Sequence, residues 1–180
     1  MHSNLSTYLL NIKTSKVIQG LKFPLSLFVV YALFHILYFS IADKTLAQIY
    51  HAIVVTPSAS VINFILPSEQ VIVSQNALIS SRAHLEVVRG CDGIGVMMLI
   101  VSAILVFSTS LKHKITGLVS GVGLVYVLNL IRIIGLYFVV VFQRDWFLPI
   151  HSYFAPTLII LLCSLFFMHW AFMTSANESH

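Results

Sequence analysis

The sequence predicts an all-α integral membrane protein: a bundle of about four transmembrane helices, with an interfacial helix and a small extracytoplasmic β-ribbon, in a single membrane domain covering 1–180. Composition is the first observation behind this fold class. Of the 180 residues, 58% are apolar and 9% are charged, whereas soluble domains are typically about 45–50% apolar and about 25% charged. The second is a mean hydropathy of +0.95, with apolar stretches that reach the roughly twenty residues a bilayer core requires.

Four apolar stretches are predicted to span the membrane, at approximately 21–41, 91–110, 115–142 and 151–173. The first is longer than the apolar region of a typical secretory signal peptide, so we expect an uncleaved helix. Tyr38 within it is expected to be a packing or interfacial residue. Gly117, Gly121 and Gly123 give the third stretch a small-residue face, which favours close helix packing.

The stretch at approximately 44–66 is apolar but interrupted by polar residues and by Pro57. Lysines lie ahead of the first span, within 13–22, and between two strong spans, at 112–114. Lysine-rich loops favour the cytoplasmic side, and these two groups would lie on opposite sides if 44–66 crossed the bilayer. We therefore expect an interfacial helix on the outer surface, although the sequence leaves a spanning helix open.

The stretch at approximately 67–90 is expected to be an extended cap. Residues 71–73 are β-branched, 74–76 have turn-forming side chains, and 84–88 end in a pair of valines. This pattern favours a hairpin or ribbon. A two-stranded ribbon is marginal alone, so it is expected to lean on the bundle.

Three polar side chains stand at the edges of the later spans: Cys91, Arg132 and His151. Ionisable residues within membrane spans are costly and usually functional. At 1.5 Å per helical residue, the three lie about 28, 25 and 30 Å above the cytoplasmic ends of their spans. They therefore share one level near the outer edge.

These residue types suit thiol chemistry. Cys91 follows Arg89 and begins a span, and both a cation and a helix N-terminus lower a thiol pKa. His151 can take the thiol proton and return it to a leaving amine. Arg132 offers donors to an oxyanion or to a substrate carboxylate. We expect no metal or other cofactor, since the remaining histidines lack ligand spacing.

Two further polar residues could support this site. Asn129 lies one helical turn before Arg132 and could orient the guanidinium or donate to a substrate. Asp92 could pair with Arg132, or could be an acid favoured at a helix N-terminus. Because it adjoins Cys91, its charge would oppose thiolate formation unless Arg89 or Arg132 compensates.

Other classes of function remain open at this point. In a non-enzymatic assembly or transport subunit, Arg132 and Asp92 would form a buried pair. A thiol oxidoreductase is less favoured, since no C-x-x-C is present and Cys163 lies about 18 Å deeper than His151. The formal charge of +4 comes from scattered residues that form no basic patch, so the expected surroundings are membrane lipid and not nucleic acid.

Three motifs together, GCDGI, NLIRI and H-S-Y-x-x-P, resemble the exosortase/archaeosortase family of membrane-embedded cysteine transpeptidases, most closely its compact exosortase H-like members. The resemblance covers roughly 70–172. It implies that Cys91 is the nucleophile, with Arg132 as the essential arginine and His151 as the histidine. Many members have Ser or Asn where this chain has Asp92.

The resemblance also implies a setting and a substrate. It implies a multi-pass protein of the bacterial inner membrane whose active site faces the periplasm. Its substrates would be secreted proteins that end in a short motif, a transmembrane helix and a basic tail. The enzyme would cut them through a thioester and transfer them to an envelope acceptor.

Overall fold

The computed structural model describes residues 3–177, and describes side chains from 21 to 174. The lysines predicted to lie on the cytoplasmic side at 13 and 16 therefore fall outside the described side chains. The long helices are α1 (Ser3–Phe39), α4 (Ile94–Val106), α5 (Leu111–Phe142) and α7 (Ala155–Asn177). The shorter elements are α2 (Asp43–Tyr50), η1 (His51–Val55), α3 (Thr56–Ile65), η2 (Pro67–Glu69), β1 (Ile72–Ser74), β2 (Ala77–Ile79), β3 (His84–Glu86), η3 (Arg144–Trp146), α6 (Phe147–Pro149) and η4 (Ile150–Phe154).

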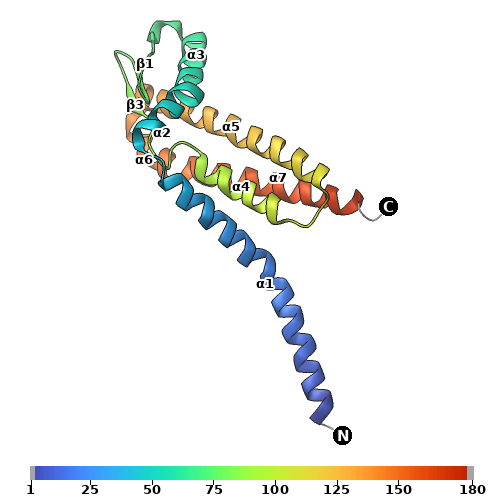
Figure 1. The fold of residues 1–180 in the computed structure, drawn as a ribbon. Coiled ribbons are helices and arrows are strands. Elements are labelled where there is room, and N and C mark those ends of the chain that lie inside the picture. Colours follow the sequence, from blue (N-terminus) through green and yellow to red (C-terminus); the bar gives the residue numbers. More distant parts are fainter. Residues whose placement is uncertain (1–2, 178–180) are drawn as a thin grey trace.

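The helices form a bundle with a cap at one end. Helices α4, α5 and α7 lie side by side, and α4 also packs against α1. Figure 1 shows the N-terminal part of α1 extending away from the bundle. The strands, α2 and α3 gather at one end of the bundle, and the C-terminal end of α7 lies at the other. The predicted class, an all-α membrane protein with a small extended cap, is confirmed.

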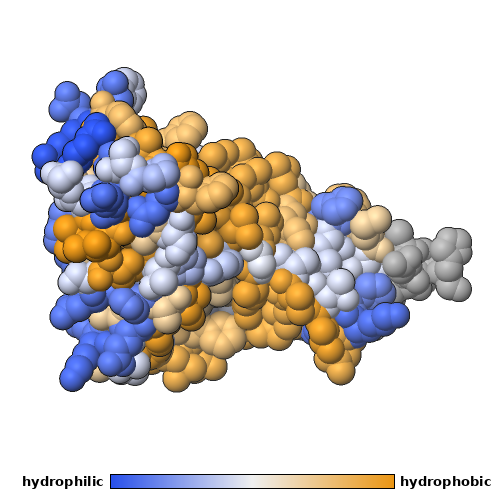
Figure 2. Space-filling view, turned by 90° about the horizontal axis from the view of Figure 1, so that it is seen from above, coloured by the Kyte–Doolittle hydropathy of each residue, from blue (hydrophilic) through white to orange (hydrophobic). Residues whose placement is uncertain are grey.

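On the face shown in Figure 2, apolar residues cover the bundle between two ends that carry polar residues. Among the described residues, four helical segments are long and apolar enough to cross a membrane: Leu21–Phe39, Asp43–Ile65, Leu111–Phe142 and Arg144–Thr174. This set differs from the expected one. The segment Asp43–Ile65 reaches span length, whereas α4 covers only Ile94–Val106, about 20 Å at 1.5 Å per residue. The interfacial placement of 44–66 stays a prediction.

The cap is a three-stranded antiparallel sheet of order β1-β2-β3, not the expected hairpin or two-stranded ribbon. Ile72 pairs with Ile79 across the first pair of strands, and Leu78 with Leu85 across the second. The expected turn lies at residues 75–76 between β1 and β2. The middle strand was not predicted, because a run of three residues carries too little periodicity.

A buried acid ties this sheet to α5. Glu69, only 3% exposed, accepts a 2.8 Å hydrogen bond from Arg82. The Tyr137 hydroxyl on α5 lies 3.0 Å from the Glu69 carboxylate and 2.8 Å from the Ser80 hydroxyl. As expected, the small sheet does lean on the bundle.

Two apolar clusters form the core. One joins the end of α1, the sheet and the C-terminal half of α5, where Ile133 and Tyr137 are buried. The other lies among α4, α5 and α7 and contains Ile104 and Cys163. Cys91 and Cys163 are both free thiols, and Cys163 fills space in an apolar core.

The small-residue face of α5 packs as predicted at two of its three glycines. A Cβ at Gly117 would lie 2.6 Å from the Trp170 indole, and one at Gly121 would lie 3.2 Å from Phe166. Both neighbours belong to α7. Gly123 faces open space.

We expect Gly117→Ala to destabilise the bundle by roughly 1–3 kcal/mol, the usual cost of overpacking a filled site. Thermal unfolding in detergent, followed by circular dichroism, should show a lower Tm. Gly123→Ala is the matched control and should not lower it. Equal Tm values for the two variants would contradict the assigned packing.

Candidate active site

Cys91 lies in a tight turn between the sheet and α4. The turn is closed by the Cys91 amide, which donates to the Val88 carbonyl at 2.9 Å. Gly90 and Gly93 flank it with φ of +87° and +76°, a region that side chains disfavour. A Cβ at Gly93 would also lie 2.7 Å from Asn129. The turn therefore favours glycine at both ends of the GCDG motif.

The neighbouring Asp92 carboxylate is buried, at 6% exposure. Its Oδ2 accepts hydrogen bonds from the hydroxyls of Tyr38 on α1 and Tyr50 at the end of α2, the latter at 2.6 Å. Its Oδ1 accepts from the amide of Ile94, the first residue of α4, at 3.2 Å. Asp92 thus serves as the acid at a helix N-terminus, one of its two expected roles. Tyr38, expected to be a packing residue, turns out to be a hydrogen-bond donor to the site.

Asn129 holds the same turn from the other side. Its Nδ2 donates to the backbone carbonyl of Asp92 at 3.0 Å, and its side chain is buried. The expectation that Asn129 orients Arg132 is not met, because Gly93 allows the turn to approach closely enough to take the amide.

His151 faces Cys91 from η4, a π-helical turn that leads into α7. The Cys91 Sγ lies 3.3 Å from Nε2 and 3.9 Å from Nδ1 of the imidazole. The ring of Phe147 stacks on the imidazole at 5.1 Å and 11°. The thiol and imidazole are therefore within hydrogen-bond reach, with the ring held in place by an aromatic neighbour.

Arg132 lies beside this pair on α5. Its Nη2 donates to the backbone carbonyl of His151 at 3.3 Å, and its buried Nε has no partner among the described residues. Within the part of the chain that the structure describes, no carboxylate forms an ion pair with Arg132. The alternative pairing with Asp92 is wrong, because two phenols already hold that carboxylate.

Arg89 points away from the thiol. It pairs with Asp43 at 2.9 Å and donates to the backbone carbonyls of Tyr38 and Ile41. Its guanidinium also lies 5.0 Å from the centre of the Tyr38 ring. The expectation that Arg89 compensates for Asp92 beside the thiol is not met, and Arg89 instead ties the turn to the end of α1.

Burial raises the pKa of the Cys91 thiol, Arg132 lowers it and Asp92 raises it, with a net upward shift. A helix N-terminus and a nearby cation were expected to lower the pKa of this thiol, but the net shift is upward. The first amide of α4 is bound to Asp92, and Arg89 is engaged elsewhere, so only Arg132 opposes desolvation. The thiol is largely protonated at neutral pH and needs a base.

Three residues of the site were missed by sequence reasoning: Tyr38, Tyr50 and Phe147. The hydroxyls of Tyr38 and Tyr50 lie 2.8 Å apart. The only signal in the sequence for the two tyrosines was their position within apolar segments, which does not name their partner. Phe147 stands four residues before His151, the spacing at which side chains meet on a helix.

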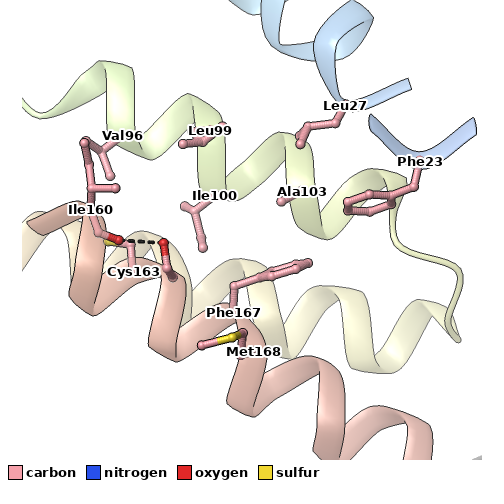
Figure 3. Close-up of a pocket in the computed structure, with 11 residues that line it drawn as sticks. Phe23, Leu27, Val96, Leu99, Ile100, Ala103, Ile160, Cys163, Phe167 and Met168 are labelled. Carbon is pink, nitrogen blue, oxygen red and sulfur yellow. Dashed lines mark hydrogen bonds between the residues drawn. The ribbon is translucent and has the colours of Figure 1, made fainter. Parts of the chain in front are cut away.

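Apolar cavities adjoin the site and the bundle below it. One, of about 310 Å³, is lined by Tyr50, Asp92 and Asn129 among others. Another, of about 210 Å³, lies between α5 and α7 and is lined by Arg132 and Ile150 among others. A further one, of about 240 Å³, lies between α1, α4 and α7 and is lined by Cys163, Phe23 and Val96 among others (Figure 3). Among the described residues, no three His, Cys, Asp or Glu side chains gather closely enough to share a metal ion.

We expect alkylation of Cys91 to be slow at neutral pH and to accelerate as pH rises beyond the range of an ordinary thiol. A raised pKa keeps the thiolate fraction small until higher pH. The measurement is the pH profile of modification by a small neutral reagent in a Cys163→Ala background.

An exposed thiol made by Gln48→Cys, with both native cysteines replaced by alanine, is the matched control for this profile. Its midpoint should lie below that of Cys91. A Cys91 midpoint at or below the control's would contradict the raised pKa.

The comparisons with known proteins agree with the motifs. The family model described as transmembrane exosortase matches residues 5–169. No curated protein matches the chain, and no solved structure matches it. The family match covers most of the chain and includes the Cys91 turn, Arg132 and His151. The chain therefore belongs to the transmembrane exosortase family, and this membership points to a membrane-embedded sorting transpeptidase.

Proposed function

We propose that this protein is a membrane-embedded cysteine protease and transpeptidase. It cleaves the C-terminal sorting signals of secreted proteins through a thioester on Cys91 and transfers them to an acceptor in the envelope. The observation that carries the proposal is the 3.3 Å contact between Cys91 Sγ and His151 Nε2. Family membership supports the reaction class, and the geometry supports the assignment of the nucleophile and base.

The first step is proton transfer from the thiol to the imidazole. Nε2 of His151 takes the proton as Sγ attacks the scissile carbonyl carbon, which forms a C–S bond and a tetrahedral oxyanion. A general base is needed because burial raises the pKa of the Cys91 thiol. Such transfers require near hydrogen-bond range, which the contact provides.

Arg132 supplies positive charge next to this pair. One nitrogen, Nη2, binds the His151 carbonyl, and the buried Nε is unpartnered among the described residues. A preorganised donor in a water-poor site stabilises developing negative charge strongly. Arg132 is therefore assigned to the oxyanion, or to a substrate carboxylate beside it.

Collapse of the intermediate breaks the C–N bond and leaves a thioester on Cys91. The imidazolium of His151 gives its proton to the departing amine. An amine, water or a glycan-linked nucleophile then attacks the thioester carbonyl, the C–S bond breaks, and the thiol regains its proton. Transfer and hydrolysis differ only in the second nucleophile.

The substrate helix is assigned to the apolar surface below the turn. The cavity in Figure 3 lies beside α4, where Val96 follows Cys91 by five residues, and Phe23 and Leu27 of α1 line its other side. A transmembrane helix lying there would leave its preceding motif at the sheet end, beside the thiol. With the lysines of 112–114 on the cytoplasmic side, the site faces the periplasm of a bacterial inner membrane.

The competing hypothesis, a subunit with Arg132 as a structural charge, has less support. It required a buried pair with Asp92, and the carboxylate is instead held by Tyr38 and Tyr50. A structural arginine also gives no reason for a thiol and an imidazole to meet beside it.

Co-expression with a secreted substrate that carries a C-terminal sorting signal tests the proposal. We expect Cys91→Ala to abolish processing. His151→Ala should slow it by roughly 10²–10⁴-fold, the usual contribution of a general base. Arg132→Ala should slow it by roughly 10²–10³-fold, as for loss of an oxyanion donor. The measurement is the ratio of processed to unprocessed substrate, at matched membrane levels of each variant.

Gly123→Ala is the matched control, since a Cβ there meets open space and Gly123 lies neither at the thiol nor along the cavity assigned to the substrate helix. It should process the substrate at the wild-type rate. Normal processing by Cys91→Ala would remove the nucleophile, and with it the proposed reaction.

A further inference from the structure

The carbonyl of His151 lacks the backbone donor that a helix normally supplies. Within η4 the amide of Ala155 donates to the carbonyl of Ile150, five residues earlier. The same spacing would give the His151 carbonyl the amide of residue 156. That residue is Pro156, which has no N–H. The π-helical turn and the proline that follows it therefore leave the His151 carbonyl without a backbone donor.

Arg132 fills this vacancy, with Nη2 donating to the His151 carbonyl at 3.3 Å. A carbonyl shielded from water is costly to leave without a donor. The bond therefore fixes the guanidinium against the backbone of the residue whose imidazole contacts Cys91. It is a link between the candidate base and the candidate oxyanion donor.

A related arrangement lies at η1 (His51–Val55), where Pro57 follows the π-helical turn by the same two residues that separate Pro156 from η4. The carbonyl bound there is one residue further along: Ile53 lies four residues before Pro57, whereas His151 lies five before Pro156. The hydroxyl of Tyr126 on α5 donates to the Ile53 carbonyl at 2.9 Å. At each turn a side chain of α5 thus donates to a carbonyl four or five residues before a proline that has no N–H.

We propose that Pro156 is a positioning residue: by withholding an amide from the His151 carbonyl, it reserves that carbonyl for Arg132 and so sets the guanidinium beside the Cys91–His151 pair. This inference rests on the proposed function for its meaning in catalysis, but not for its geometry. Single π-helical turns in helices are rare and often lie at functional sites. A positioning role for Pro156 accounts for the proline that ends the H-S-Y-x-x-P motif.

The substitution Pro156→Ala returns an amide to this position. The His151 carbonyl can then bond within the helix, and Arg132 is released. The charged and titratable groups that face the Cys91 thiol are Arg132, His151 and Asp92. Only Arg132 moves in this scheme, so the readout is the pH profile of Cys91 alkylation in a Cys163→Ala background.

We expect Pro156→Ala to slow alkylation at neutral pH by about threefold to tenfold, the size of a half to one unit of thiol pKa. Arg132→Ala should slow it at least as much. The double variant should be no slower than Arg132→Ala alone, because both changes remove the same charge. Pro57→Ala is the matched control, and it should leave the profile unchanged.

An ester at position 156, introduced as the hydroxy-acid analogue of alanine, separates the missing amide from the proline ring. It lacks the N–H, so it should restore the wild-type profile. The Tm of Pro156→Ala should equal or exceed the wild-type value, since a helical hydrogen bond is regained. A rescue by the ester also shows that slower alkylation does not come from unfolding.

Two results would overturn the inference: a Pro156→Ala profile that superimposes on the wild type, or single-variant effects that add in the double variant. Neither depends on substrate processing. If Cys91→Ala still processed the substrate, the proposed function would fail while the alkylation data would still decide the role of Pro156.

Discussion

The buried Asp92 carboxylate is the constraint on which the site depends. A carboxylate taken out of water is unfavourable unless hydrogen bonds replace its hydration. Here Tyr38 and Tyr50 supply two of them and the first amide of α4 supplies a third. These bonds join α1, α2 and α4 at one point. The Cys91 turn is therefore placed by its neighbour, and the C-terminal part of α1 stays packed along α4, while its N-terminal part extends away from the bundle (Figure 1).

Helix α5 connects the two halves of the site. Asn129 and Arg132 lie one turn apart on it, and each donates to a backbone carbonyl, of Asp92 and His151 respectively. A rigid helix thus sets the distance between the turn that carries the thiol and the turn that carries the imidazole. Sites supported on regular elements are held more precisely than sites on loops, which matters because Cys91 itself lies in a loop.

The environment of the thiol favours a paired mechanism over a free thiolate. Desolvation raises the pKa of the Cys91 thiol, and the adjoining acid raises it further. A protonated thiol at rest is less exposed to oxidation, since susceptibility follows thiolate character. The imidazole of His151, 3.3 Å from the thiol, lies within reach to accept its proton. Asp92 is thus consistent with an active nucleophile even though its charge opposes ionisation.

The sequence by itself determined the fold class and three polar residues of the site, because apolar span length and the cost of intramembrane charge are local properties. It also indicated a cap and a packing face on α5. Only the tertiary structure decided the partners. Asp92 bonds to Tyr38 and Tyr50, and not to Arg132, because hydrogen-bond partners depend on which helices meet and on side chains 42 to 54 residues apart. The middle strand of the sheet and the short α4 were likewise decided by packing and by turn geometry, which hydrophobic periodicity does not reveal.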